Sequence, residues 1–329
     1  MIDDRWSDDA EEMAGALGRV LSKHSGSEDV RAAEAGASTA ALDEALAEFG
    51  LADLAGEPEL VIRAARELGA TLAPTAFVAK IPALMMLGRD DITDGVDRDL
   101  ALAGPPLVAL RADDGNVGLA ATGPAVRSSG GDLVIRTQGL TATETTQVSS
   151  EDWRCWGWLA SAAALVGAAE QIVTITVDYV SQRRQFGQPV GAFQGVAFPL
   201  ADAATAVRGA DLLLRKTTYL TRDASVPPQH FAAMTAHTAR RAARQAASAA
   251  HQAMGGQGFT LEADTQLYSR RIRSWSSTLA DPREALAFMA RTLANPQTRS
   301  QITDLWQFDE GFVLPRWARE AEELLAQPS

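Results

Sequence analysis

Apolar residues recur at helical spacing through most of the second half of the chain. Between positions 152 and 182 they form one stripe, which predicts a long helix ending near Gln182. A second helix is predicted after Phe193 and a third after Pro227. The pair Asp281-Pro282 predicts the start of a fourth, because proline is favoured in the first helical turn. Four long helices with short connections indicate a bundle.

The first half of the chain divides into two parts of different pattern. Residues 1–98 carry amphipathic helical segments such as "LDEALAEFGLADL" and "PELVIRAARELGATLAP". Residues 99–150 alternate short β-prone runs with glycine-containing turns, which predicts about four or five short antiparallel strands. The expected fold class is therefore mainly α with a small β domain: an N-terminal helical domain (1–98), a reduced middle β domain (99–150), and a C-terminal helical bundle with a C-terminal extension (151–329).

Charge and composition narrow the possible partners and location. The net charge of −12 and isoelectric point near 4.9 argue against nucleic acid, which requires clustered cations. The longest apolar run, "WGWLASAAALVGAAEQIV", is alanine-rich and contains Glu170, so a buried core helix is expected rather than a membrane span. The acidic start "MIDDRWSDDAEEM" does not resemble a signal peptide, and a cytoplasmic location is expected. The four histidines lack metal-ligand spacing, so no metal site is expected.

Two short motifs concentrate polar and glycine residues between the helices. The first is "SQRRQFGQPVGAFQG" at 181–195, and the second is "HQAMGGQGF" at 251–259. Taken alone, Arg183 and Arg184 fit a solvated helix end, and Gly255 and Gly256 fit a helix C-cap. A guanidinium beside bare glycine backbone also suits a phosphate group.

With its order of helices, β unit and bundle, and with both motifs at matching places, the chain resembles the acyl-CoA dehydrogenases. That resemblance implies an FAD cofactor and assigns both motifs to the ADP half of its site. In the first motif, Arg183 matches the arginine that binds the pyrophosphate, Phe186 the aromatic beside the adenosine, and Gln194 a hydrogen-bonding amide.

The second motif matches the family's glycine loop. Here Gln252 would supply an amide, while Gly255 and Gly256 would let the backbone approach the same half of FAD, where a Cβ would obstruct it. The resemblance also implies that Arg154, near the start of the first bundle helix, approaches a phosphate of the acyl-CoA.

The catalytic base of the family has no counterpart in the sequence. Thr278 stands where the resemblance places the glutamate that removes the α-proton, and a hydroxyl needs a base of its own for that step. Asp281 is a candidate shifted base, although it also fits a helix N-cap, and Glu151 lies a turn before the other position used in the family. The stretches that hold the flavin ring are also missing from 99–150.

The two cofactor motifs are present, whereas the catalytic base and the ring-binding stretches are missing. Together these observations predict a non-catalytic subunit of a heteromeric FAD-dependent acyl-CoA dehydrogenase. The resemblance implies a heterotetramer with a second, catalytic subunit, as in actinobacterial members that act on steroid side-chain CoA thioesters. Two alternatives stay open: a self-sufficient acyl-CoA dehydrogenase with Asp281 or Glu151 as its base, and a flavin-free scaffold that regulates the catalytic chain.

Aromatic residues indicate where a partner subunit would dock. Four of the seven tryptophans stand at positions 153, 156, 158 and 275, and large rigid aromatics are common anchors of interfaces. The apolar residues of the segment "ITDLWQFDEGFVLPRWAREAEELL" near the C-terminus are expected to cover a partner as well.

Overall fold

The computed structural model describes residues 5–222, 226–278 and 282–295. It comprises two units, Met1–Leu286 and Ala287–Ser329. The described residues of the second unit are the end of helix α10 (Pro282–Ala294) and Asn295. Asp281, the candidate base, and the C-terminal extension from 296 lie outside the described residues, as does the side chain of Thr278.

Helices fill the N-terminal part of the first unit, as the amphipathic pattern predicts. Helix α1 begins after Ser7, whose Oγ accepts the N–H of Ala10 at 3.2 Å, and acidic residues occupy its first turn. Helix α4 opens on Pro58. The elements of this part are α1 (Asp8–His24), α2 (Ser27–Glu34), α3 (Ala40–Phe49), the 3-10 turn η1 (Leu51–Leu54), α4 (Pro58–Ala70) and α5 (Phe77–Leu87).

The middle region forms two small sheets rather than one antiparallel unit. Strands β1 (Ile92–Asp94), β3 (Leu107–Arg111), β4 (Asn116–Ala121) and β7 (Glu144–Ser149) form the first, in the order β1-β3-β4-β7. Strands β2 (Leu100–Leu102), β6 (Leu133–Arg136) and β5 (Val126–Arg127) form the second. The expectation of purely antiparallel pairing was wrong, because β1 pairs with β3 in parallel. Strand β1 also begins ahead of the expected boundary at 98/99.

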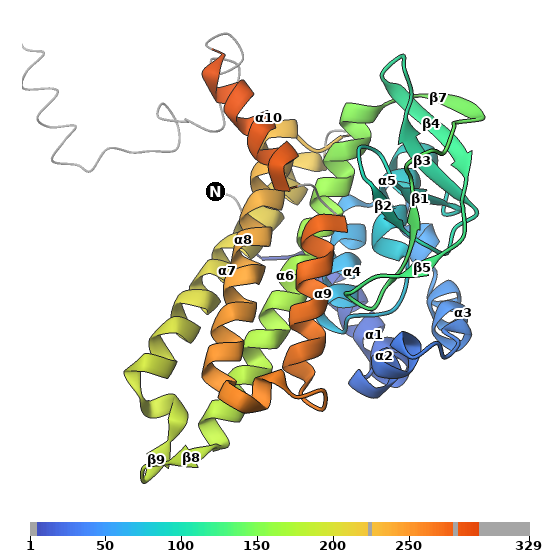
Figure 1. The fold of residues 1–329 in the computed structure, drawn as a ribbon. Coiled ribbons are helices and arrows are strands. Elements are labelled where there is room, and N and C mark those ends of the chain that lie inside the picture. The colour runs from blue at the N-terminus through green and yellow to red at the C-terminus, as the bar shows by residue number, and fades with distance from the viewer. Residues whose placement is uncertain (1–4, 223–225, 279–281, 296–329) are drawn as a thin grey trace, which may run out of the picture. The chain divides into compact units, whose positions relative to one another are not determined.

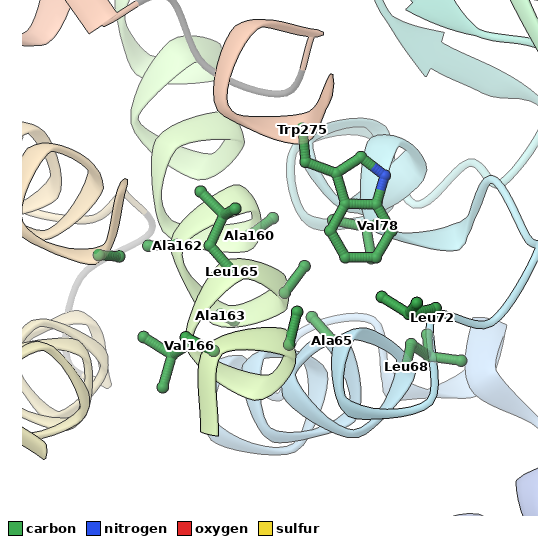
Figure 2. Close-up of a cluster of buried hydrophobic side chains, with 14 of the residues drawn as sticks. Ala65, Leu68, Leu72, Val78, Ala160, Ala162, Ala163, Leu165, Val166 and Trp275 are labelled. Carbon is green, nitrogen blue, oxygen red and sulfur yellow. The ribbon is translucent and has the colours of Figure 1, made fainter. Parts of the chain in front are cut away.

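The bundle is built around α6 (Ser150–Gln182), which is buried along most of its length. Around it pack α7 (Gln194–Thr221), α8 (Gln229–Met254) and α9 (Asp264–Thr278), and on its other side the N-terminal helices (Figure 1). Figure 2 shows the shared core, in which α6 alanines lie against α4 and Trp275 of α9. By length and composition α6 is apolar enough to span a membrane, but 72% of its most apolar window is buried inside the protein.

The fold class predicted from the sequence is confirmed, with two corrections in the bundle. A helix does begin at Pro282 as predicted, but it is α10, and the fourth helix that packs in the bundle is α9, which starts at Asp264. The tryptophans at 153, 156, 158 and 275 are core residues with exposed fractions of 0–4%, so their interpretation as an interface was wrong. Trp153, for instance, donates its indole N–H to Asp94 at 3.0 Å. The indole N–H finds its acceptor inside the chain because the β unit packs on the start of α6.

Candidate cofactor site

The first motif begins where α6 stops. Arg183 is the C-cap of α6 in an extended conformation, and its backbone is fixed on both sides. Its N–H donates to the carbonyl of Tyr179 at 2.9 Å, and its own carbonyl accepts the N–H of Val190 at 2.7 Å. The side chain is exposed, and within the described residues its guanidinium makes no hydrogen bond or ion pair. A rigid backbone therefore presents a cation to whatever lies outside the chain.

A two-residue hairpin follows Arg183. Strand β8 (Arg184–Gln185) pairs with β9 (Gln188–Pro189), and Phe186 and Gly187 form the turn between them. Both turn residues have positive φ, 54° and 84°, which is the conformation of a type I′ hairpin turn. Glycine adopts it freely, whereas a phenylalanine there is strained. The Phe186 ring is also 91% exposed, touching Phe193 edge-on at 6.1 Å between centroids.

The start of α7 lies directly behind this hairpin. A short 3-10 turn, η2 (Val190–Ala192), leads to Phe193, the N-cap of the helix. Gln194 is the first helical residue, and its amide is exposed and unpaired among the described residues. A Cβ added at Gly195 would meet nothing within 4 Å. The end of α6, the hairpin and the start of α7 thus expose side chains to solvent, with open space around them.

The second motif is the 3-10 turn η3 (Gly255–Phe259), which follows the last turn of α8, where Gln252 is exposed. We call residues 255–263 the glycine loop. Gly255 has a φ of 57°, and a Cβ at Gly255 or Gly256 would meet nothing within 4 Å. The buried side of the loop is Gly258, where a Cβ would lie 3.1 Å from Met254 Cβ, while the exposed ring of Phe259 stacks on His251 at 4.8 Å. Burial there lowers the pKa of His251.

The two motifs lie at the same end of the bundle. Helices α6 and α8 pack side by side and run in the same direction, because α7 carries the chain back in the opposite direction, so the C-terminal ends of α6 and α8 lie at one end of the bundle (Figure 1). The six positions predicted for the ADP half of FAD thus lie at one end of the bundle, and all of them are exposed: Arg183, Phe186, Gln194, Gln252, Gly255 and Gly256.

Arg154 lies elsewhere, near the start of α6, and its charge is already engaged. Its guanidinium forms an ion pair with Glu284, lies 3.4 Å from Asp97, and stacks over the Trp158 ring at 5.1 Å. Burial raises the pKa of Glu284. Burial opposes ionisation of Asp97 too, but the hydrogen bond and charge of Arg111 outweigh it and lower the pKa of Asp97. An anionic substrate would have to displace these carboxylates from Arg154.

A cleft of about 930 Å³ lies between the β unit and α9, a feature that the sequence did not indicate. Arg273, Ser274 and Ser277 of α9 line one side of it, next to Thr278, where the resemblance places the base. Two carboxylates line the other side. Asp97 is bonded to Arg111 at 2.7 Å, whereas Asp99 is exposed and makes no ion pair within the described residues. Neither carboxylate belongs to a motif, so sequence reasoning missed both.

The other reactive groups of the described residues do not form a second site. Glu151, on the first turn of α6, is exposed 3.9 Å from Arg154. Cys155 is buried, which raises its thiol pKa to about 12 and keeps it protonated. Among the residues described, no three His, Cys, Asp or Glu side chains gather as metal ligands would.

Comparison with known proteins identifies a family and a fold. Residues 156–277 match the family model of the acyl-CoA dehydrogenase C-terminal domain. This part of the chain belongs to the acyl-CoA dehydrogenases. Over 320 residues, covering 85% of this chain and 97% of the relative, it is 28% identical to the acyl-CoA dehydrogenase IpdE2 of Mycolicibacterium smegmatis. The IpdE2 of Mycobacterium tuberculosis is 35% identical over 126 residues, which is 38% of this chain and 37% of that protein.

Solved structures confirm the acyl-CoA dehydrogenase fold. The Tcur3481-Tcur3483 steroid ACAD, solved as a variant, superposes with a TM-score of 0.76 at 18% identity, covering 88% of this chain and 99% of that one. The ChsE4-ChsE5 complex of Mycobacterium tuberculosis gives a TM-score of 0.75 at 17% identity, covering 89% and 99%. At these identities the likeness establishes the fold alone. The family match over residues 156–277 supports an oxidoreductase activity.

Proposed function

We propose that this chain is the non-catalytic subunit of a heteromeric FAD-dependent acyl-CoA dehydrogenase. It holds the ADP half of an FAD whose ring reacts in the active site of a second subunit. The observation that carries the proposal is the state of the two motifs. Every predicted ligand of the ADP half is exposed at one end of the bundle, and Arg183 is free of any partner within the described chain.

The residues present fit an ADP group by their chemistry. Arg183 would pair with pyrophosphate oxygens, and a charge-assisted bond from guanidinium is the strong kind. The bare backbone at Gly256 leaves room for close approach, and the exposed ring of Phe186 offers a face for the adenosine. When bound, FAD supplies the hydride acceptor. This chain's part is to bind and orient it.

The region where the catalytic base would stand supports the proposal that a second subunit carries out the chemistry. Thr278 carries a hydroxyl where the family has a glutamate. In the cleft, Asp97 is held by Arg111, and an ionised carboxylate with a lowered pKa is a weak proton acceptor. The α-proton of the acyl-CoA would therefore be taken by a carboxylate of the catalytic subunit, and water would be excluded there.

The names of the similar structures support a heteromeric assembly and a bulky substrate. One is a two-component complex and another is described as a steroid ACAD. We extend this to a heterotetramer that dehydrogenates a steroid side-chain CoA thioester at its α and β carbons.

Purification of the chain alone and with a co-expressed catalytic subunit tests the proposal. We expect colourless protein alone and a yellow, active complex. In that complex, Arg183→Ala is expected to weaken FAD binding roughly 10- to 150-fold, the usual cost of a lost charged hydrogen bond. Arg184→Ala, which removes the neighbouring charge, serves as control and is expected to change FAD affinity little, because the Arg184 guanidinium is directed to the carbonyl of Gly187 in its own hairpin. Unchanged FAD affinity in Arg183→Ala would favour the flavin-free scaffold.

One observation favours a second candidate, a self-sufficient dehydrogenase. The cleft beside Ser277 is large enough for a drug-sized ligand, and the carboxylate of Asp99 lines it. On this alternative the chain alone would be yellow and active, and Asp99→Asn would abolish turnover. The paired arrangement of Asp97 and Arg111 argues against it, because it places an ion pair on the cleft wall.

A further inference from the structure

Helix α2 directs one polar face at α9. Ser27, Arg31 and Glu34 are spaced four and three residues apart and so lie along one side of the helix. Each of the three makes side-chain contacts to residues more than two hundred positions later in the sequence. We call these three residues the α2 face. An eight-residue helix contributes little stability by itself. The role of the α2 face therefore depends on the residues that it contacts.

At its N-terminal end the α2 face holds the junction between the glycine loop and α9. Arg31 Nη2 donates to the carbonyl of Glu262 at 2.9 Å and to Asp264 Oδ1 at 2.8 Å. Ser27 Oγ donates to the other oxygen, Asp264 Oδ2, at 2.7 Å. Asp264 is the first residue of α9, and Glu262 lies within the glycine loop. The planar guanidinium thus fixes a backbone carbonyl and a carboxylate at once.

At its other end the same face reaches the rim of the cleft. Glu34 accepts from Arg270 Nη2 at 2.7 Å and from Arg271 Nη2 at 3.0 Å. Arg271, 1% exposed, also donates to Asp132 at 2.6 Å and to the carbonyl of Gly130 at 3.0 Å. The turn between β5 and β6 is therefore tied to α9 and α2 together.

We infer that Arg31 is a positioning residue for the glycine loop, and through it for the ADP half of the cofactor; this inference rests on the proposed function. The outer side of the loop meets open space at Gly255 and Gly256, so packing does not set its place there. Its far end is set by where α9 begins, and Arg31 with Ser27 fixes that point. A binding constellation must be held within about 0.5 Å of its productive geometry, so a small displacement of the loop should weaken binding.

The partial exposure of this contact separates positioning from stability. The side chains of Arg31 and Asp264 are 23% and 34% exposed, and ion pairs so close to solvent contribute little to the free energy of unfolding. Loss of Arg31 should consequently move the loop more than it lowers the melting temperature.

The test uses the full chain and its complex with the catalytic subunit. In Arg31→Ala we expect faster amide hydrogen exchange at residues 255–263 of the full chain, and in the complex about 10-fold weaker FAD binding. Arg31→Lys keeps the positive charge but lacks the planar, two-pronged guanidinium. Its loop exchange rate and its FAD affinity should lie between those of Arg31→Ala and the native chain. Ser27→Ala, a milder change, should move both measurements in the same direction.

Arg63→Ala is the matched control, since Arg63 also joins two carboxylates of the N-terminal helices, Glu11 and Glu67, but does not contact α9. It should lower the melting temperature at least as much and leave loop exchange and FAD affinity unchanged. Equal effects of Arg63→Ala and Arg31→Ala on FAD affinity would overturn the inference, because both would then act through stability. Normal loop exchange in Arg31→Ala would overturn it as well. If Arg183→Ala fails to weaken FAD binding, the proposed function fails, while the exchange measurement still decides the positioning role.

Discussion

Glycines at the α4–α6 crossing and glycines at the far end of the bundle are present for opposite reasons. At the crossing, a Cβ on Gly69 would lie 2.1 Å from the carbonyl oxygen of Ala164, and one on Gly167 would lie 2.0 Å from that of Arg66. At the far end, a Cβ on Gly187 or Gly256 would meet nothing within 4 Å.

The contrast separates what the chain needs for itself from what it offers to others. The crossing glycines let two helices approach backbone to backbone, and the intrachain contacts explain them fully. Gly187 is explained by its positive φ, but Gly256 has neither a positive φ nor a close neighbour. Phe186, exposed and strained at this end, has an edge contact with Phe193 that leaves its ring 91% exposed, so burial in the chain does not explain it either. Features that the chain's own packing leaves unexplained mark the place where another molecule is expected.

Gly167→Ala should give the largest effect of the series. The added methyl collides with backbone that cannot rotate away, so we expect the free energy of unfolding to fall by about 3 kcal/mol. Gly209→Ala is the control, because Gly209 lies in α7 with open space around it and should gain up to about 1 kcal/mol in helix propensity. Denaturant unfolding of the full chain measures both. A stable Gly167→Ala chain would show that α4 and α6 are not in such close contact.

Gly256→Ala should reverse this result. The methyl projects into space that is empty in the isolated chain, so stability should stay the same or rise slightly. In the complex with the catalytic subunit, FAD affinity should fall about 10-fold, since the methyl would intrude on the cofactor. Fluorescence titration with FAD measures the affinity. Undiminished binding would mean that the glycine loop faces solvent rather than FAD.

Phe186→Gly tests whether strain is retained for binding. Removal of a side chain at a φ of 54° should raise the free energy of unfolding by about 1 kcal/mol. Loss of the exposed ring should nevertheless weaken FAD binding, because stacking of a base on an aromatic ring contributes about 1 kcal/mol or more. Gly187→Ala, one residue later at a φ of 84°, should have the opposite effect on stability. A Phe186→Gly chain that loses stability would place the ring in the core contacts instead.

Periodicity and motif spacing predicted much of this molecule, because both depend on local sequence. The fold class and the extent of α6 follow from patterns within single helices and loops, whereas the grouping of Arg183 with Gly256 was implied by the resemblance to the acyl-CoA dehydrogenases. The tryptophan prediction failed because composition counts large aromatics without showing where the β unit packs, and that packing buries Trp153 against Asp94. The helix predicted at Pro282 exists as α10, but the strong proline signal led it to be taken for the fourth bundle helix, ahead of the weaker pattern after Asp264 that forms α9.

The contacts of Arg154 and the α2 face were beyond sequence reasoning for a different reason. Arg154 meets Glu284 and Arg31 meets Asp264 across more than one hundred residues, and each acid is ordinary in its local context. Such pairs depend on the relative placement of finished elements, which no short pattern encodes. The cleft beside Ser277 is likewise a product of how the β unit and α9 meet.

Acidification should have the smallest effect of the series, and it should distinguish the glycine loop from the interior of the bundle. Burial lowers the pKa of both His251, under the glycine loop, and His237, on the body of α8. A histidine whose folded pKa is lowered contributes stability that is present above its unfolded value of about 6.5 and is lost as pH falls through the folded pKa. Between pH of about 7.5 and 5.5 the native chain should therefore lose a little stability. His251→Gln and His237→Gln should each remove part of that loss.

Only His251→Gln should also flatten the pH dependence of FAD affinity in the complex, because His251 supports Phe259 of the glycine loop. Equal flattening by both variants would mean that protonation destabilises the bundle as a whole, and that the glycine loop does not respond to pH independently of the interior.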